Sequence, residues 1–72
     1  MNDGYTMLAA AVVERAVLDY RQAQENIRAK YNVLDAQNMI RRLERFFRSE
    51  WFGILSELDG EDLIELMRRQ EA

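Results

Sequence analysis

Apolar side chains return to one side of a helix throughout residues 5–31, and this periodicity constrains the fold more than any other feature of the chain. At 100° per residue, one broad stripe collects Tyr5, Ala9, Val12, Val13, Ala16, Val17, Tyr20, Ala23, Ile27 and Tyr31. No glycine or proline interrupts this stretch. The pattern therefore predicts a long amphipathic helix over about residues 4–28.

A second apolar ridge lies on the opposite side of the same predicted helix. It consists of Met7, Ala11 and Leu18, with Ala10 alongside. One chain can cover the main stripe, but this ridge would then face water. We therefore expect Met7, Ala11 and Leu18 to form a self-association surface, and two-fold pairing of this surface predicts a homodimer.

Two similar segments mark the starts of two further helices. In the first, Asp35 is suited to an N-cap, and Leu34 and Met39 are spaced as a hydrophobic staple, so a second helix is expected over about residues 36–56. Leu58, Asp59 and Leu63 repeat this spacing, which predicts a third helix over about residues 60–69. Asn32 is suited to a left-handed turn at the end of the first helix.

These elements predict an all-α fold with a single domain over residues 1–72. Short connections favour antiparallel packing, so we expect a long helical hairpin with a short third helix across one end, completed by dimerisation. A chain of 72 residues supports only a marginal core, which makes self-association a plausible source of further stability.

The composition excludes the common catalytic and metal-binding chemistries. The sequence has no cysteine and no histidine, so disulfides, thiolate or imidazole metal sites and the usual nucleophile–base pairs are ruled out. The acids at Glu57, Asp59, Glu61 and Asp62 lack the spacing of a calcium loop and are better explained by helix capping. We expect a non-enzyme that uses no cofactor and no metal.

The apolar run from Met7 to Val13 is too short to span a membrane, since a transmembrane helix needs roughly 18 or more apolar residues. The N-terminus also lacks the basic stretch of a signal peptide. These features predict a cytoplasmic protein without membrane contact.

Glu50 falls in the middle of the apolar face of the helix expected over residues 36–56. A carboxylate there must be paired, hydrogen-bonded or protonated. We expect a buried polar residue that fixes helix register by meeting Arg15, Arg21 or a tyrosine hydroxyl. The expected core around it contains Phe46, Phe47 and Trp51 from this helix and Val12, Ala16, Tyr20 and Ile27 from the first.

The polar face of the same helix carries a row of arginines with an aromatic neighbour. Arg41, Arg45 and Arg48 lie in one row, and Phe52 is expected to project among them. Such a surface suits a protein partner or the phosphates and bases of a nucleic acid. It is also compatible with a solvated face in which Glu44 pairs with the arginines and Phe52 is covered by the third helix. The net charge of −3 disfavours indiscriminate nucleic-acid binding.

Residues 45–69, RFFRSEWFGILSELDGEDLIELMRR, resemble a family of small proteins encoded by phages, prophages and mobile elements of Gram-positive bacteria. The family pattern is an FFRS-x-W-F core followed by a leucine, a D-G-E turn and an L-I-x-x-L helix. The resemblance covers about the last third of the chain. It implies a mobile-element setting inside a bacterial host cell.

Together these features predict a non-enzymatic module that binds a host or phage protein and self-associates. The most specific form of this hypothesis is an inhibitor of a host defence complex, of the anti-CRISPR kind. This form is favoured by the resemblance to small mobile-element proteins. The alternative is a small nucleic-acid-binding or transcription-modulating protein that uses the arginines of residues 41–48. A structural phage protein acting only through assembly is a third possibility.

Overall fold

Four helices make up the described part of the chain, which comprises the backbone of residues 3–71 and the side chains of residues 8–70 in a computed structural model. They are α1 (Asp3–Arg28), α2 (Val33–Phe47), α3 (Glu50–Leu55) and α4 (Gly60–Glu71). No strand occurs in these residues, so the predicted all-α class is confirmed.

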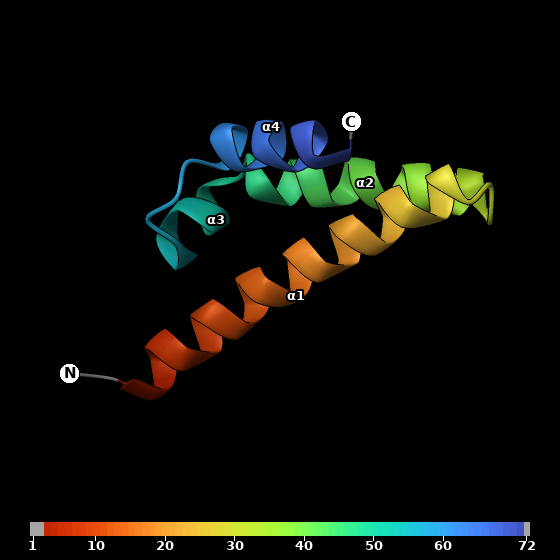
Figure 1. Cartoon of the computed structure of the whole chain (residues 1–72). Coiled ribbons are helices and arrows are strands. Elements are labelled where there is room, and N and C mark those ends of the chain that lie inside the picture. The colour runs from red at the N-terminus through yellow and green to blue at the C-terminus, as the bar shows by residue number, and fades with distance from the viewer. Residues whose placement is uncertain (1–2, 72) are drawn as a thin grey trace.

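The length of α1 sets the shape of the molecule. With 26 residues it is about 39 Å long, whereas the 15 residues of α2 span only about 22 Å. The two helices meet at the turn that joins them and separate along their length, while α4 packs on α2 (Figure 1). The N-terminal half of α1 therefore extends past α2 and lies on the side of the short helix α3 (Figure 1).

The turn between α1 and α2 is closed by backbone hydrogen bonds and two left-handed residues. The Tyr31 amide donates to the Asn26 carbonyl at 2.8 Å, and the Lys30 amide donates to the Ile27 carbonyl at 3.0 Å. This is the Schellman arrangement, with Lys30 in the left-handed position at φ 58°. Asn32 is also left-handed, at φ 47°, as its residue type predicts.

Asp35 does not cap α2, contrary to the sequence-based prediction. The helix begins at Val33 with Asn32 in the N-cap position, so Asp35 lies in the first turn. A carboxylate there still interacts favourably with the helix dipole. At the start of α4, by contrast, Asp59 is the predicted cap, because its Oδ1 accepts hydrogen bonds from the amides of Glu61 and Asp62.

The helix expected over residues 36–56 is broken in two at Arg48 and Ser49. Ser49 has an extended backbone, its Oγ accepts a hydrogen bond from the Phe52 amide at 3.3 Å, and it donates one to the Phe46 carbonyl at 2.6 Å. Ser49 thus ends one helix and starts the next, which is a common use of serine. The break changes the rotational phase of every residue after it.

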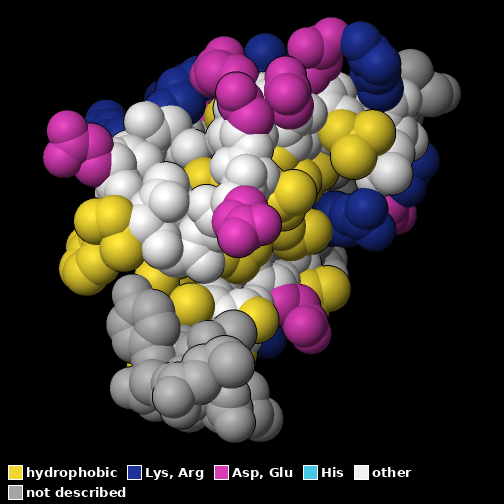
Figure 2. All heavy atoms as spheres, turned by 90° about the vertical axis from the view of Figure 1, so that its left-hand side faces the viewer, with side chains coloured by type: hydrophobic (Ala, Val, Ile, Leu, Met, Phe, Trp, Pro, Cys, Tyr) yellow, Lys and Arg dark blue, Asp and Glu magenta, His cyan; other side chains and the backbone are white. Residues whose placement is uncertain are grey.

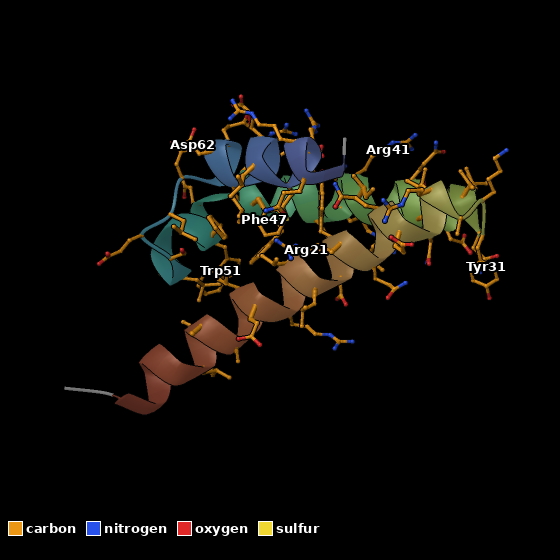
Figure 3. All side chains as sticks on the ribbon, viewed as in Figure 1. Arg21, Tyr31, Arg41, Phe47, Trp51 and Asp62 are labelled. Carbon is orange, nitrogen blue, oxygen red and sulfur yellow. The ribbon has the colours of Figure 1, made fainter. Side chains whose placement is uncertain are left out.

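This change of phase rearranges the core relative to the sequence-based prediction. Phe52 is 1% exposed and takes the inward place expected for Trp51, which is 63% exposed. Phe47 is buried as expected and points into the space between α1, α2 and α4 (Figure 3). Val12 was also expected in the core but is exposed. The buried cluster comprises Ala16, Tyr20, Phe47, Phe52, Ile64 and Met67.

Gly60 lets α4 begin directly against the end of α2. A Cβ atom at this position would lie 1.8 Å from the Phe47 carbonyl oxygen, closer than any side chain can approach. The aromatic rings pack tightly at the same place, with Phe47 and Phe52 edge to face at a centroid distance of 5.4 Å. The glycine of the D-G-E turn is therefore needed for this close approach.

Truncation of Phe47 to alanine should lower the free energy of unfolding by roughly 3–5 kcal/mol, because it leaves a cavity among buried side chains. The matched variant Trp51→Ala should change it by less than about 0.5 kcal/mol, since this ring is exposed. Chemical denaturation followed by circular dichroism measures both. Equal effects of the two substitutions would contradict the core described above.

Candidate protein-binding surfaces

Among the described side chains one carboxylate is buried, that of Glu44 on α2, and three helices meet around it. The Tyr20 hydroxyl of α1 donates to Glu44 Oε2 at 2.6 Å. An Arg68 guanidinium nitrogen of α4 donates to both carboxylate oxygens at 2.9 Å. Glu44 is only 8% exposed, and these contacts offset the cost of burying its charge. Arg48 Nη1 adds a longer contact of 3.7 Å.

This network fixes how the helices sit together. Gln24 reinforces it, because its side-chain amide donates to the Met67 carbonyl at 3.0 Å and so links α1 to α4 a second time. No buried side-chain nitrogen or oxygen among the described residues lacks a hydrogen-bond partner. The polar part of the interior is therefore structural and fully satisfied.

Glu50 is not the buried carboxylate, contrary to the sequence-based prediction. It lies in the first turn of α3 and is exposed, and no hydrogen bond reaches it from the described side chains. The prediction assumed an unbroken helix through residue 56, and the break at Ser49 turns Glu50 outward. The expected pairing of a buried acid with a tyrosine and an arginine occurs instead at Glu44, six residues earlier.

The row of arginines on α2 is exposed but lacks its expected aromatic neighbour. Arg41, Arg45 and Arg48 border a shallow hollow of about 540 Å³ together with Glu44 and Ser49. Arg48 pairs with Glu61, and Arg41 donates to Asn38 at 3.2 Å. Phe52 is buried and does not project among them. The exposed arginines and the buried Phe52 agree with the alternative of a solvated face. The pairing expected in that alternative differs, because Glu44 is buried and contacts only Arg48 of the row, at 3.7 Å.

The outer ridge of α1 is open where the structure describes it. Ala11 is exposed and Leu18 is 52% exposed. The third member of the predicted self-association surface, Met7, lies outside the described side chains. Leu8 and Val12 are also exposed, on the flank of the same half of α1. The N-terminal half of α1 thus presents apolar atoms to solvent on more than one side.

An apolar groove runs between α1 and the segment that contains α3, and the sequence pattern did not predict it. Its volume is about 740 Å³, and it is lined by Ala9, Ala10, Val13, Glu14, Gly53, Ile54, Leu55, Ser56, Glu57 and Leu58. We call it the α1–α3 groove. Figure 2 views this end of the molecule and shows hydrophobic side chains at the surface next to acidic ones.

Two aliphatic side chains in the wall of the α1–α3 groove are strongly exposed. Ile54 is 63% exposed and Leu58 is 58% exposed. Trp51, on the side of α3 that is toward α1 in Figure 3, is also 63% exposed. Large apolar side chains gathered in one place on a small protein are typical of an interaction site, whereas scattered ones are ordinary. The sequence predicts this groove only if the helix break is placed at Ser49.

The chain matches no protein-family model, and comparisons with curated proteins and with solved structures found no match. Within the described residues, no helix is both long enough and apolar enough to cross a membrane. No group of three or more carboxylates in the same residues is arranged to hold a metal ion. Any function must therefore be inferred from the exposed residues of the protein.

Replacing Glu44 with glutamine should lower the free energy of unfolding by about 1–3 kcal/mol, because the amide lacks the charge that pairs with Arg68 and replaces one acceptor oxygen of the network with an N–H₂ donor. Glu65→Gln is the matched control: this acid pairs with Arg69 on the exposed face of α4, and losing an exposed pair costs at most about 0.5 kcal/mol. Urea titrations of the two variants at neutral pH measure the difference. A Glu44 variant as stable as the control would show that the network is dispensable.

The stability of the protein should fall as the pH rises from about 10 to about 12. Burial, together with the neighbouring Glu44 carboxylate, raises the pKa of Tyr20 from 10.0 to about 12, although Arg68 opposes this. The folded state then keeps a proton that the unfolded state releases, so the stabilisation present below pH 10 is lost across this interval.

Tyr20→Phe should flatten this part of the stability profile, and it should also destabilise the protein at neutral pH because Glu44 loses a donor. Tyr31→Phe changes an exposed ring and should keep the wild-type profile. Unfolding free energies measured across the alkaline range decide the matter. An unchanged slope in Tyr20→Phe would assign the pH dependence to another group.

Proposed function

We propose that this protein is a non-enzymatic protein-binding module that self-associates through the outer ridge of α1 and receives a partner at the α1–α3 groove. The observation that carries the proposal is the exposed apolar surface on the N-terminal half of α1 and on α3. Its large members are Leu8, Val12, Leu18, Trp51, Ile54 and Leu58. Burial of such side chains supplies the main driving force of protein association.

Several properties of the groove favour a protein over a small molecule. It is open and lined mainly by aliphatic side chains and small residues, and Glu14 and Glu57 are the charged residues among the described ones that line it. Small-molecule sites enclose most of their ligand and direct several polar groups at it. The buried acid Glu44 offers no catalytic alternative, because Tyr20 and Arg68 already engage its oxygens.

The setting of this activity rests on the resemblance of residues 45–69 to small proteins of phages and mobile elements. An accessory protein that blocks a host defence complex in the bacterial cytoplasm agrees with a module that acts by binding alone. This part of the proposal stays a prediction. Purification of the tagged protein from a bacterial lysate with and without nuclease would test whether it captures a protein complex directly.

Nucleic-acid binding is the second candidate, and the hollow bordered by Arg41, Arg45 and Arg48 favours it. The burial of Phe52 weakens it, since base stacking needs an exposed ring. If phosphates were bound, the association constant for DNA would fall steeply with salt. A binding titration at several salt concentrations separates this candidate from the first.

In the proposed dimer, the hairpin of α1 and α2 pairs with a second copy through the outer ridge of α1. Ala11 is small enough for two helices to approach closely, and Leu18 would be removed from water at the contact. Burial of this surface at about 25 cal/mol per Å² would add to a core that the chain length limits. A two-fold axis would set α1 against its own copy.

We expect a mass of twice 8.5 kDa at high micromolar concentration, and Leu18→Glu should shift it to the monomer because two carboxylates would then face each other across the contact. Leu34→Glu, at an exposed leucine on α2, is the matched control and should stay dimeric. Analytical ultracentrifugation over a concentration series gives both masses. A wild-type protein that is monomeric throughout would end the self-association proposal.

A further inference from the structure

We infer that the α1–α3 groove binds an amphipathic helix of another protein whose apolar face is flanked by lysine or arginine. The inference rests on the proposed function, because it names the class of partner for the same groove. Three properties of the lining residues support it: the shape of the floor, the exposed side chains of the wall and the sign of the charges.

The floor of the groove is made of small residues, which allow a helix to approach closely. Ala9 and Ala10 contribute from α1 and Gly53 from α3. A Cβ atom added at Gly53 would meet no atom within 4 Å, so space remains open above it. Between two helices, such a floor accommodates a third helix in the manner of ridges that pack into a groove.

The wall offers apolar side chains from both α1 and the segment that contains α3. Ile54 and Leu58 are more than half exposed on one side, and Val13 is partly buried on the other. Helix-in-groove recognition uses apolar side chains three or four residues apart on the bound helix, and these insert between such walls.

The charges of the groove determine the rest of the partner's chemistry. Of the described residues that line it, Glu14 on α1 and Glu57 after α3 are charged, and none is a lysine or arginine. Neither carboxylate has an ion-pair partner among the described side chains. A bound helix with basic residues beside its apolar stripe would place opposite charges next to both acids.

A second copy of this chain is a poorer occupant for the same reason. Two α1–α3 grooves facing each other would bring four carboxylates into one apolar contact, where like charges repel. The self-association surface proposed above uses other residues of α1, because neither Ala11 nor Leu18 lines the groove. The groove therefore fits a different chain.

The experiment uses the full-length protein and a synthetic helical peptide of about 16 residues, or four to five turns. The peptide carries leucine at helical spacing on one face, lysine on both flanks and no aromatic residue. Trp51 is the only tryptophan of the protein and lies in α3, so its fluorescence reports binding. We expect a saturable change, and we expect a peptide with glutamate in place of lysine to bind at least about tenfold more weakly, which corresponds to roughly 1.4 kcal/mol.

Two groups of variants connect the signal to the groove. The double variant Ile54→Ser, Leu58→Ser should weaken binding of the lysine peptide at least about tenfold, whereas Leu34→Ser, at an exposed leucine outside the groove, should leave it unchanged. Glu14→Lys with Glu57→Lys should reverse the preference, so that the glutamate peptide binds better. Glu65→Lys on α4 is the charge control. The control positions Leu34 and Glu65 do not line the groove, and circular dichroism verifies the fold of each variant.

Equal binding of the lysine and glutamate peptides, or binding that the groove variants leave intact, would overturn the inference. If neither peptide bound and Ile54→Ser with Leu58→Ser turned a dimer into a monomer, the occupant would be a second copy, which also overturns it. The outcome is separate from that of the self-association proposal, because Leu18→Glu changes the mass without touching the groove. Each proposal can therefore fail alone.

Discussion

The carboxylate of Glu44 constrains the whole arrangement, because it lies inside a small apolar core and must meet donors from two other helices at once. The Tyr20 hydroxyl approaches from α1 and the Arg68 guanidinium from α4. A displacement of either helix along its axis would break one of these hydrogen bonds and leave a buried charge short of partners, which costs more than an intact pair contributes. The network therefore selects one register among the many that apolar helix faces allow, while the aromatic side chains around Phe47 pack against one another in the buried cluster.

The parts of the fold that follow from local periodicity could be predicted from the sequence, whereas those that depend on one hydrogen bond could not. The stripe from Ala9 to Ala23 determined α1, and the Asp59 cap determined the start of α4. The sequence-based prediction places Ser49 inside a helix. In the structure its hydroxyl accepts a hydrogen bond from the Phe52 amide, and the preceding helix ends there. Because rotation accumulates at 100° per residue, that one error exchanged the places of Trp51 and Phe52 and turned Glu50 outward.

The candidate surfaces also divide into one that helical periodicity predicts and one that depends on the helix break. The exposure of Leu18 and Ala11 on the outer side of α1 could be read from helical phase alone. The α1–α3 groove could not, because Ile54 and Leu58 were assigned to an unbroken helix and its extension. Its acidic residues, Glu14 and Glu57, are more than 40 positions apart in the sequence and become neighbours of one groove only through the packing of α3 beside α1.

The position of Arg68 near the end of the last helix has a consequence for how the chain acquires its structure during synthesis. When α1 and α2 have left the ribosome, Glu44 still lacks its cationic partner, and Ile64 and Met67 are not yet present to cover Phe47. The first two helices alone would hold an incompletely paired acid beside bare aromatic rings, a combination that opposes stable burial. Closure of the core therefore needs residues 64–68 of α4, and α1 with α2 alone is an incomplete folding unit.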